Sequence, residues 1–292
     1  TGATAVQCVP HLGTSAGHLY VFQRTPSSVD VRANRPTDPE WAGHLEPGWH
    51  QKRMDNFHIL TAGGFQEEDL VADGWTHVMW DNTQAAVSTE EEAAAIPLTF
   101  LTAWQMVVDK LGVRPGDDVL VMAAGSGVSV AAIQIAKLFG ARVIATAGSE
   151  DKLRRAKALG ADETVNYTHP DWPKEVRRLT GGKGADKVVD HTGALYFEGV
   201  IKATANGGRI AIAGASSGYE GTLPFAHVFY RQLSILGSTM ASKSRLFPIL
   251  RFVEEGKLKP VVGQVLPLEA AAEGHRLLEE RRVFGKVVLQ VG

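Results

Sequence analysis

The chain has 292 residues, a length that accommodates about two domains. Hydrophobic residues make up 44%, charged residues 21%, and the net charge is -2, so the composition excludes a disordered, collagen-like or strongly basic chain. No apolar run reaches the roughly 18 residues of a membrane helix and no secretory signal opens the chain, so we expect a cytoplasmic protein with no membrane and no nucleic-acid partner.

The composition changes along the chain. The first 80 residues hold 6 of the 10 histidines and 4 of the 6 tryptophans and carry a net charge of -4, whereas the remainder carries +2. From about Asp81, apolar β-rich runs alternate with amphipathic segments, which is typical of βαβ units around a parallel sheet. We therefore expect two parts, residues 1–80 and 81–292. Because Thr1 falls inside what reads as a glycine turn leading into a helix, we also expect a segment upstream of it.

The predicted elements follow one another regularly. Capping boxes at Ser88 with Glu91 and at Thr89 with Glu92 open a helix that Pro97 interrupts, and a second helical stretch runs to Lys110. Strands are predicted at residues 118–123, 142–146, 163–167, 187–191, 209–213 and 233–236. Helices are predicted to start near Val128, Glu150, Trp172, Tyr196 and Phe225. With right-handed crossovers these elements make an α/β fold with a doubly wound parallel sheet of the Rossmann type.

The end of the chain no longer alternates in this way. A strand at 259–268, a helix at 269–282 and a strand at 286–291 look like pieces of another layer.

A glycine turn links the first predicted strand to its helix. Gly125 to Val128 follow the strand, and the helix then places apolar residues at positions 128, 131, 132, 135 and 138 on one face. Free backbone N–H groups and the positive end of the helix converge at such a turn, where a pyrophosphate fits. The alternative is a plain tight turn, but strand, turn, helix and next strand follow in register and favour a cofactor.

The end of the second strand bears on which dinucleotide binds. Folds that prefer NAD place an acid there, whereas this chain has Ala147, Gly148 and Ser149. Lys152 and Arg154 follow within reach, which favours the 2′-phosphate of NADP. The alternative is that both form a solvated helix face.

These residues, together with EEAAAIPLTFLTAW, LRRAKALGADETVNY, GADKVVDHTG and GGRIAIAG, resemble the medium-chain dehydrogenase/reductase family over about residues 82–292. The quinone-oxidoreductase and zinc-type alcohol-dehydrogenase-like branches are the most similar. The resemblance implies that NADP contacts Gly125, Ser126, Gly127 and Val128 at the pyrophosphate, Ser149 and Lys152 at the 2′-phosphate, Tyr167 on the adenosine side, and Thr192, Gly193, Gly214 and Ala215 at the nicotinamide. Ser129 departs from the family, which usually has a third glycine at this position.

The first part of the chain resembles a different family. TGATAVQCVPHLG, LYVFQRTPSSVDVR and PEWAGHLEPGW are similar to the NADPH-binding region of Baeyer-Villiger flavin monooxygenases, over about residues 1–77. This part stands where the dehydrogenase family carries its substrate domain. The resemblance implies that the strands at 259–268 and 286–291 belong to that missing domain, so we expect them to have no sheet to join and to be loosely held. Thr1 to Ala5 would be the tail of a GxGxxA fingerprint, with Arg24 and Thr25 at the position that reads the 2′-phosphate. No FAD fingerprint and no FxGxxxH signature is present, so the flavin chemistry is not carried over.

Several residues remain without an assigned role. The histidines are irregularly spaced, no HExxH occurs and Cys8 is the single cysteine, so we predict no metal site. His191, which follows Asp190 at a strand end, is either a proton donor or a structural histidine, and the second interpretation is favoured. The arginine pairs at 154–155, 177–178 and 281–282 are interpreted as solvated helix faces.

The sequence thus predicts a zinc-free, NADPH-dependent oxidoreductase that passes a hydride to a quinone, enone or other carbonyl compound, with no single catalytic residue assigned. The alternative is a non-catalytic NADPH-binding fusion fragment that lacks a substrate domain. The apolar edge strand at 233–236 is an aggregation hazard unless it is paired, and in the resembling family this edge pairs with its twofold mate. We therefore expect a homodimer through residues 233–239.

Overall fold

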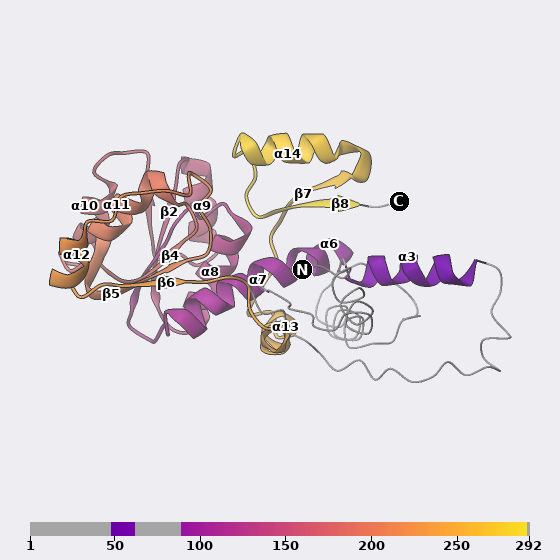
Figure 1. The fold of residues 1–292 in the computed structure, drawn as a ribbon, viewed down its shortest axis with the longest axis horizontal. Helices are drawn as coiled ribbons and strands as arrows, with labels where there is room; N and C mark the ends of the chain where they lie inside the picture. The colour runs from indigo at the N-terminus through magenta and orange to yellow at the C-terminus, as the bar shows by residue number, and fades with distance from the viewer. Residues whose placement is uncertain (1–47, 62–88, 291–292) are drawn as a thin grey trace, which may run out of the picture. The chain divides into compact units, whose positions relative to one another are not determined.

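A six-stranded parallel sheet forms the centre of the computed structural model, which describes residues 48–61 and 89–290 (Figure 1). Its strand order is β3-β2-β1-β4-β5-β6, and every neighbouring pair is parallel. The strands are β1 (Asp118–Val121), β2 (Arg142–Ala147), β3 (Glu163–Asn166), β4 (Ala185–Asp190), β5 (Thr204–Ile212) and β6 (Ser234–Gly237). This is the doubly wound order, in which the crossover point between β1 and β4 opens a crevice at the carboxyl ends of the strands. The predicted Rossmann-type fold is confirmed.

Helices cover both faces of the sheet. They are α8 (Gly127–Leu138), α9 (Glu150–Ala158), α10 (Trp172–Leu179), α11 (Ala194–Ala203) and the short α12 (Phe225–Tyr230). One hydrophobic core joins Val119 and Val143 to α8 and α9, and a second joins Leu120 and Ile144 to α10 and α11. Because successive strand residues point to opposite faces, strands buried on both sides consist almost wholly of apolar residues.

The segment before β1 is helical, as predicted. Thr89 caps α6 (Glu90–Ala95) by accepting the backbone N–H of Glu92, whereas Pro97 begins a new helix, α7 (Pro97–Trp104). A π-helical stretch, η2 (Gln105–Lys110), continues from α7. Trp104 at the end of α7 packs against Phe139 and against Phe252 of α13 (Leu246–Glu254), which follows the one-turn η3 (Lys243–Arg245).

The last elements form a small sheet of their own. β7 (Val262–Pro267) and β8 (Lys286–Gln290) pair in parallel, and the one-turn η4 (Leu268–Ala270) and α14 (Ala271–Glu279) connect them (Figure 1). The expectation that these strands have no sheet to join is therefore wrong, because each pairs with the other. Val265 remains 40% exposed and Leu289 36% exposed, so this sheet is covered far less than the first.

The largest difference from the predicted strand boundaries is in β5, which begins at Thr204 rather than at Arg209. The intervening Asn206, Gly207 and Gly208 indicate a turn, yet here they lie in a strand whose register shifts against β4.

Contacts divide the chain into two units, Thr1–Ala33 and Asn34–Gly292. Most of the monooxygenase-like part lies outside the described residues. Within that part, α3 (Trp49–Thr61) is described, with Gln51 donating to Asp55. Among the helices described, none is long and apolar enough to cross a membrane.

Candidate dinucleotide site

The turn between β1 and α8 exposes backbone donors at the carboxyl edge of the sheet. Ser126 caps α8 by accepting the N–H of Ser129 at 3.1 Å, and Ala123 adopts a left-handed φ of 51°. The backbone N–H groups of Gly127 and Val128 belong to the first turn of α8, where no earlier helical carbonyl can accept them. The turn therefore presents donors and the positive end of a helix to the same point, which suits an anion.

Two lysine side chains pack against the glycines of this turn, Lys152 against Gly125 and Lys286 against Gly127. A Cβ on Gly125 would lie 2.8 Å from Lys152 Cδ, and a Cβ on Gly127 would lie 2.9 Å from Lys286 Cδ and 2.8 Å from Thr99 Cγ2. Lys152 Nζ donates to the carbonyl of Arg281 at 2.5 Å, and Gly285 N–H donates to Gly125 O. Glycine at 125 and 127 thus leaves the space that these lysine side chains occupy, and the C-terminal segment is held against the turn.

The end of β2 is rich in positive charge. Ser149 caps α9 by accepting the N–H of Lys152 at 3.4 Å. Burial, followed by the charges of Arg281 and Arg155, lowers the pKa of Lys152. Since like charges already oppose one another here, a bound anion would relieve that repulsion.

Tyr167 follows β3 and lies beside the end of β2. Its Cε2 atom lies 3.2 Å from the position of a Cβ on Gly148, and its ring lies 4.6 Å from that of Tyr196. Burial, and then Tyr196, raise the pKa of Tyr167, so its hydroxyl is neutral at ordinary pH. The structure therefore places a flat neutral side chain beside Gly148, at the end of β2.

The residues predicted for the nicotinamide half lie together at the ends of β4 and β5. Thr192 donates its N–H and its hydroxyl to Asp190 Oδ1 at 2.8 and 2.6 Å. Gly193 has a φ of 82°, and a Cβ there would lie 2.7 Å from Ala215 Cα. Gly214 lies directly before Ala215, where its own Cβ would be 3.3 Å from the Cβ of His191. Thr192, Gly193, Gly214 and Ala215 thus form one continuous edge.

His191 does not extend along this edge. Its Nε2 atom lies 2.7 Å from Ser129 Oγ and 2.9 Å from Ser126 Oγ, which directs the ring to the glycine turn. Burial lowers the pKa of His191, against the charge of Asp190. These contacts favour the structural interpretation of this histidine over the proton donor.

Sequence reasoning missed the contributions from the far end of the chain. Lys286 and the carbonyl of Arg281 reach the turn from positions more than 125 residues away. The arginine pairs are not all solvated, because Arg155 stacks on Phe284 at 4.3 Å and Arg177 donates to three backbone carbonyls. No local sequence pattern predicts these contacts, because they depend on tertiary packing.

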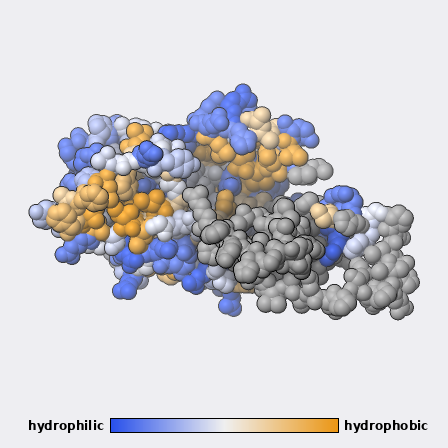
Figure 2. All heavy atoms as spheres, viewed as in Figure 1, coloured by the Kyte–Doolittle hydropathy of each residue, from blue (hydrophilic) through white to orange (hydrophobic). Residues whose placement is uncertain are grey.

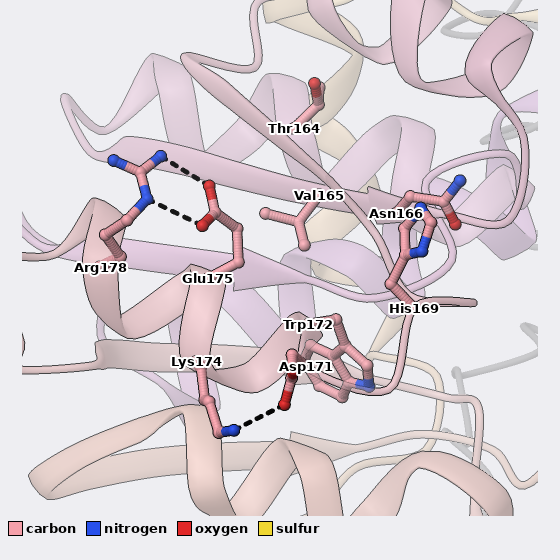
Figure 3. Close-up of a pocket in the computed structure, with 9 residues that line it drawn as sticks. All are labelled: Thr164, Val165, Asn166, His169, Asp171, Trp172, Lys174, Glu175 and Arg178. Carbon is pink, nitrogen blue, oxygen red and sulfur yellow. Dashed lines mark hydrogen bonds and ion pairs between the residues drawn. The ribbon is translucent and has the colours of Figure 1, made fainter.

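A hollow of about 440 Å³ lies beside α10 and β3, the strand at one edge of the sheet (Figure 3). Its charged residues pair with one another, Arg178 with Glu175 at 2.6 Å and Lys174 with Asp171 at 2.7 Å. The hollow is lined by Thr164, Val165, Asn166, His169, Asp171, Trp172, Lys174, Glu175 and Arg178. Since its charges are neutralised internally, it offers less to an anion than the glycine turn does.

The sheet, its helices and the glycine turn together define a Rossmann-type α/β region. Residues 127–255 match the family model described as zinc-binding dehydrogenase. Quinone oxidoreductase-like protein 2 of Bos taurus is 30% identical over 210 residues, which are 68% of this chain and 60% of that protein. This part of the chain belongs to the medium-chain dehydrogenase/reductase family.

Solved structures agree with this assignment. A structure described as an NAD-dependent alcohol dehydrogenase is 98% identical, with a TM-score of 0.69, and the match covers 70% of this chain and 60% of that one. A 2-octenoyl-CoA carboxylase reductase in complex with NADP is 30% identical, with a TM-score of 0.65, over 71% of this chain and 51% of that one. The chain thus spans little more than half the length of these relatives.

A second group of relatives matches the other resemblance. A Baeyer-Villiger monooxygenase of Stachybotrys chlorohalonatus is 65% identical over 78 residues, which are 27% of this chain and 12% of that protein. The chain therefore combines a short segment similar to monooxygenases with a longer dehydrogenase segment.

Proposed function

We propose that this chain binds NADPH and serves as the dinucleotide-binding part of an oxidoreductase that transfers a hydride to a quinone, enone or other carbonyl compound. The observation that carries the proposal is the glycine turn between β1 and α8, where the first turn of α8 begins beside Gly125 and Gly127 and lysines lie on two sides. A pyrophosphate would rest on that turn. Ser149, Lys152 and Tyr167 would hold the adenosine end, and the strand-end residues 192, 193, 214 and 215 the nicotinamide.

The choice of NADPH over NADH rests on charge. No acid ends β2, and Lys152 lies beside Arg281 and Arg155, whose charges lower its pKa. A 2′-phosphate placed there would make charge-assisted hydrogen bonds, whereas the two nearby carboxylates already have partners in the protein, Glu150 with Asn166 and Asp151 with Arg154. The 98% identical relative is described as NAD-dependent, so the affinities of this chain for NADPH and NADH need to be compared directly.

Zinc does not fit the described residues, although the matching family model is named for it. Among residues 48–61 and 89–290, no group of three or more His, Cys, Asp or Glu side chains could hold a metal ion. The chain's one cysteine is Cys8, so a site with several thiolates is excluded by composition. We propose no metal-assisted step.

The bound nicotinamide would supply the hydride, and the protein would supply binding and orientation. The edge formed by Thr192, Gly193, Gly214 and Ala215 presents backbone and small side chains, without a charged group, to the ring. Gly193 and Gly214 keep this edge flat, because a Cβ at either would meet the opposite strand end. Orientation of this kind accelerates hydride transfer without a dedicated acid.

A second candidate function is a dinucleotide-binding module that turns nothing over. It is favoured by the exposed strands β7 and β8, where Val265 and Leu289 are 40% and 36% exposed. Apolar strand faces of this kind are normally buried against another layer of secondary structure. The two candidates share the cofactor and differ in catalysis.

Titration separates these possibilities. We expect NADPH to quench the intrinsic fluorescence of the purified chain at lower concentration than NADH does. Equal affinities, or tighter binding of NADH, would contradict the NADPH proposal, and no binding of either would contradict the function itself. Turnover of a quinone or enone by the same sample would support the oxidoreductase. Binding of the dinucleotide without turnover would support the non-catalytic binding module.

We further propose a homodimer through residues 233–239, which include β6. Among the described strands, β6 pairs with β5 alone and ends the sheet. Apolar side chains are exposed next to it on α12, with Phe225 74%, Phe229 61% and Tyr230 78% exposed, and Figure 2 shows hydrophobic residues gathered there. An open apolar edge favours pairing with a second copy. Light scattering at micromolar concentration should give twice the chain mass, and a monodisperse monomer would contradict the proposal.

A further inference from the structure

The imidazole of His191 connects two parts of the dinucleotide site. The residue stands at the end of β4, between Asp190 and Thr192, where the nicotinamide half begins. Its ring nevertheless lies against the glycine turn, with Nε2 2.7 Å from Ser129 Oγ and 2.9 Å from Ser126 Oγ. One side chain therefore bridges the strand end and the turn that would hold the pyrophosphate.

The hydrogen bonds fix the position of one proton on this ring. Ser129 Oγ lies 2.6 Å from the carbonyl oxygen of Met122, which can only accept, so the Ser129 hydroxyl donates there. Ser129 Oγ is then an acceptor toward His191, and Nε2 must carry the proton at that 2.7 Å contact. The chain of donors runs from His191 through Ser129 to the carbonyl before the turn.

Ser126 completes the arrangement. Its hydroxyl oxygen accepts the backbone N–H of Ser129 at 3.1 Å, and its own proton points to Ser129 Oγ at 3.1 Å. Ser129 is fully buried, so each of these bonds is shielded from water. The cap of α8 and the imidazole are therefore parts of one network.

We propose that His191 is a positioning residue for the glycine turn: through Ser126 and Ser129 it holds the start of α8 in place toward the pyrophosphate. This inference rests on the proposed function. It also accounts for Ser129, which stands where the family usually has glycine, because glycine has no hydroxyl to relay the bond from His191 to Met122. A proton donor role is unsuited to a ring whose Nε2 proton is already bound within the protein.

Ligand binding by two variants tests the proposal. His191→Leu removes the donor, and His191→Gln retains an N–H near the position of Nε2. With 2′-AMP and NADPH as probes, we expect His191→Leu to weaken NADPH about tenfold and to leave 2′-AMP, which lacks the pyrophosphate, unchanged. His191→Gln should recover most of the loss. An equal loss of affinity for both probes, or an unchanged affinity for NADPH, would overturn the positioning role.

A double-mutant cycle gives an independent check. Ser129→Ala should weaken NADPH as His191→Leu does, and the double variant should be no weaker than either single one, because both changes break the same relay. Additive losses would show that the two residues act separately and would contradict the proposal.

The tautomer can be observed without any cofactor. In ¹⁵N spectra of histidine-labelled protein at pH 7, His191 should show a protonated Nε2 and an unprotonated Nδ1, and Ser129→Ala should release that preference. A protonated Nδ1 with bare Nε2 would overturn the network. Failure of the wild-type chain to bind NADPH and NADH, with the expected tautomer present, would instead contradict the proposed function and with it the pyrophosphate role.

Discussion

The six-stranded and the two-stranded sheets of this chain are both parallel, yet they are covered very differently. In the larger sheet Val119, Leu120 and Ile144 are fully buried, whereas Val265 of β7 and Leu289 of β8 are 40% and 36% exposed. Parallel sheets are stable when both faces are covered, since their strands are apolar on both sides. The larger sheet meets this condition with its own helices, and the smaller one does not.

The same contrast extends to function. The glycine turn, the β2 end and the β4–β5 edge all belong to the larger sheet. The smaller sheet contributes at its start, where Gly285 N–H donates to Gly125 O and Lys286 lies against Gly127. The proposed cofactor binding should therefore depend mainly on the first region.

The largest expected effect is on stability. Leu120→Ala should lower the free energy of unfolding by about 2 to 5 kcal/mol, because it leaves a cavity between the sheet and its helices. Leu289→Ala, the matched change in β8, should cost less than about 1 kcal/mol, because its side chain is 36% exposed. Chemical denaturation measures both. Equal losses would show that the two sheets are equally packed.

The next effect concerns the nicotinamide edge. Gly193→Ala should cost about 1 to 3 kcal/mol of stability, because the residue has a φ of 82° and a Cβ would lie 2.7 Å from Ala215 Cα. Gly221→Ala is the control, since a Cβ there would make only ordinary contacts, 3.6 Å from Ala194 Cα, and the residue has no left-handed φ. Thermal unfolding of both variants tests this, and a Gly193→Ala variant as stable as the control would refute the close approach.

A change at the β2 end should separate the two cofactors. Lys152→Ala should weaken NADPH by about 1 to 2 kcal/mol if the ammonium pairs with the 2′-phosphate, and should leave NADH nearly unchanged. Lys174→Ala, which removes an exposed lysine paired with Asp171, is the control. Fluorescence titration gives the affinities. A similar loss for both dinucleotides would place Lys152 at the pyrophosphate instead.

The smallest effect depends on pH. Burial alone would raise the pKa of Asp162, but hydrogen bonds from Lys137 and from the N–H of Val143 outweigh it and lower that pKa. A carboxyl with a lowered folded pKa stabilises above its unfolded value of about 3.9 and loses that contribution as the pH falls through the folded pKa. Asp162→Asn should therefore cost about 0.5 to 1 kcal/mol at pH 7 and almost nothing in acid. A difference that is constant with pH would contradict this assignment.

Local patterns account for much of the fold. The starts of β1, β2 and β3 at Asp118, Arg142 and Glu163, and of α9 at Glu150, lie where the sequence predicts them, because each follows a glycine turn or a helix cap. The register of strand, turn and helix around Gly125 also predicts where the site residues gather.

Other features depend on contacts that no local pattern encodes. The direction of the His191 ring follows from two serines more than 60 residues earlier, and the Lys286 side chain reaches Gly127 across the fold. The pairing of β7 with β8 is equally non-local, and the turn-like Asn206 and Gly207 become part of β5 through its neighbours. Tertiary packing overrides local preference at such positions.

Hydrogen exchange with and without NADPH tests the central claim most directly, because it locates the ligand and compares the two sheets in one measurement. We expect β1 and β2 to be protected throughout and β7 and β8 to exchange fast. On adding NADPH, residues 125–128 and 149–152 should gain protection while β7 exchanges as before. Uniform protection of both sheets without the cofactor, or no gain at the glycine turn with it, would contradict the account.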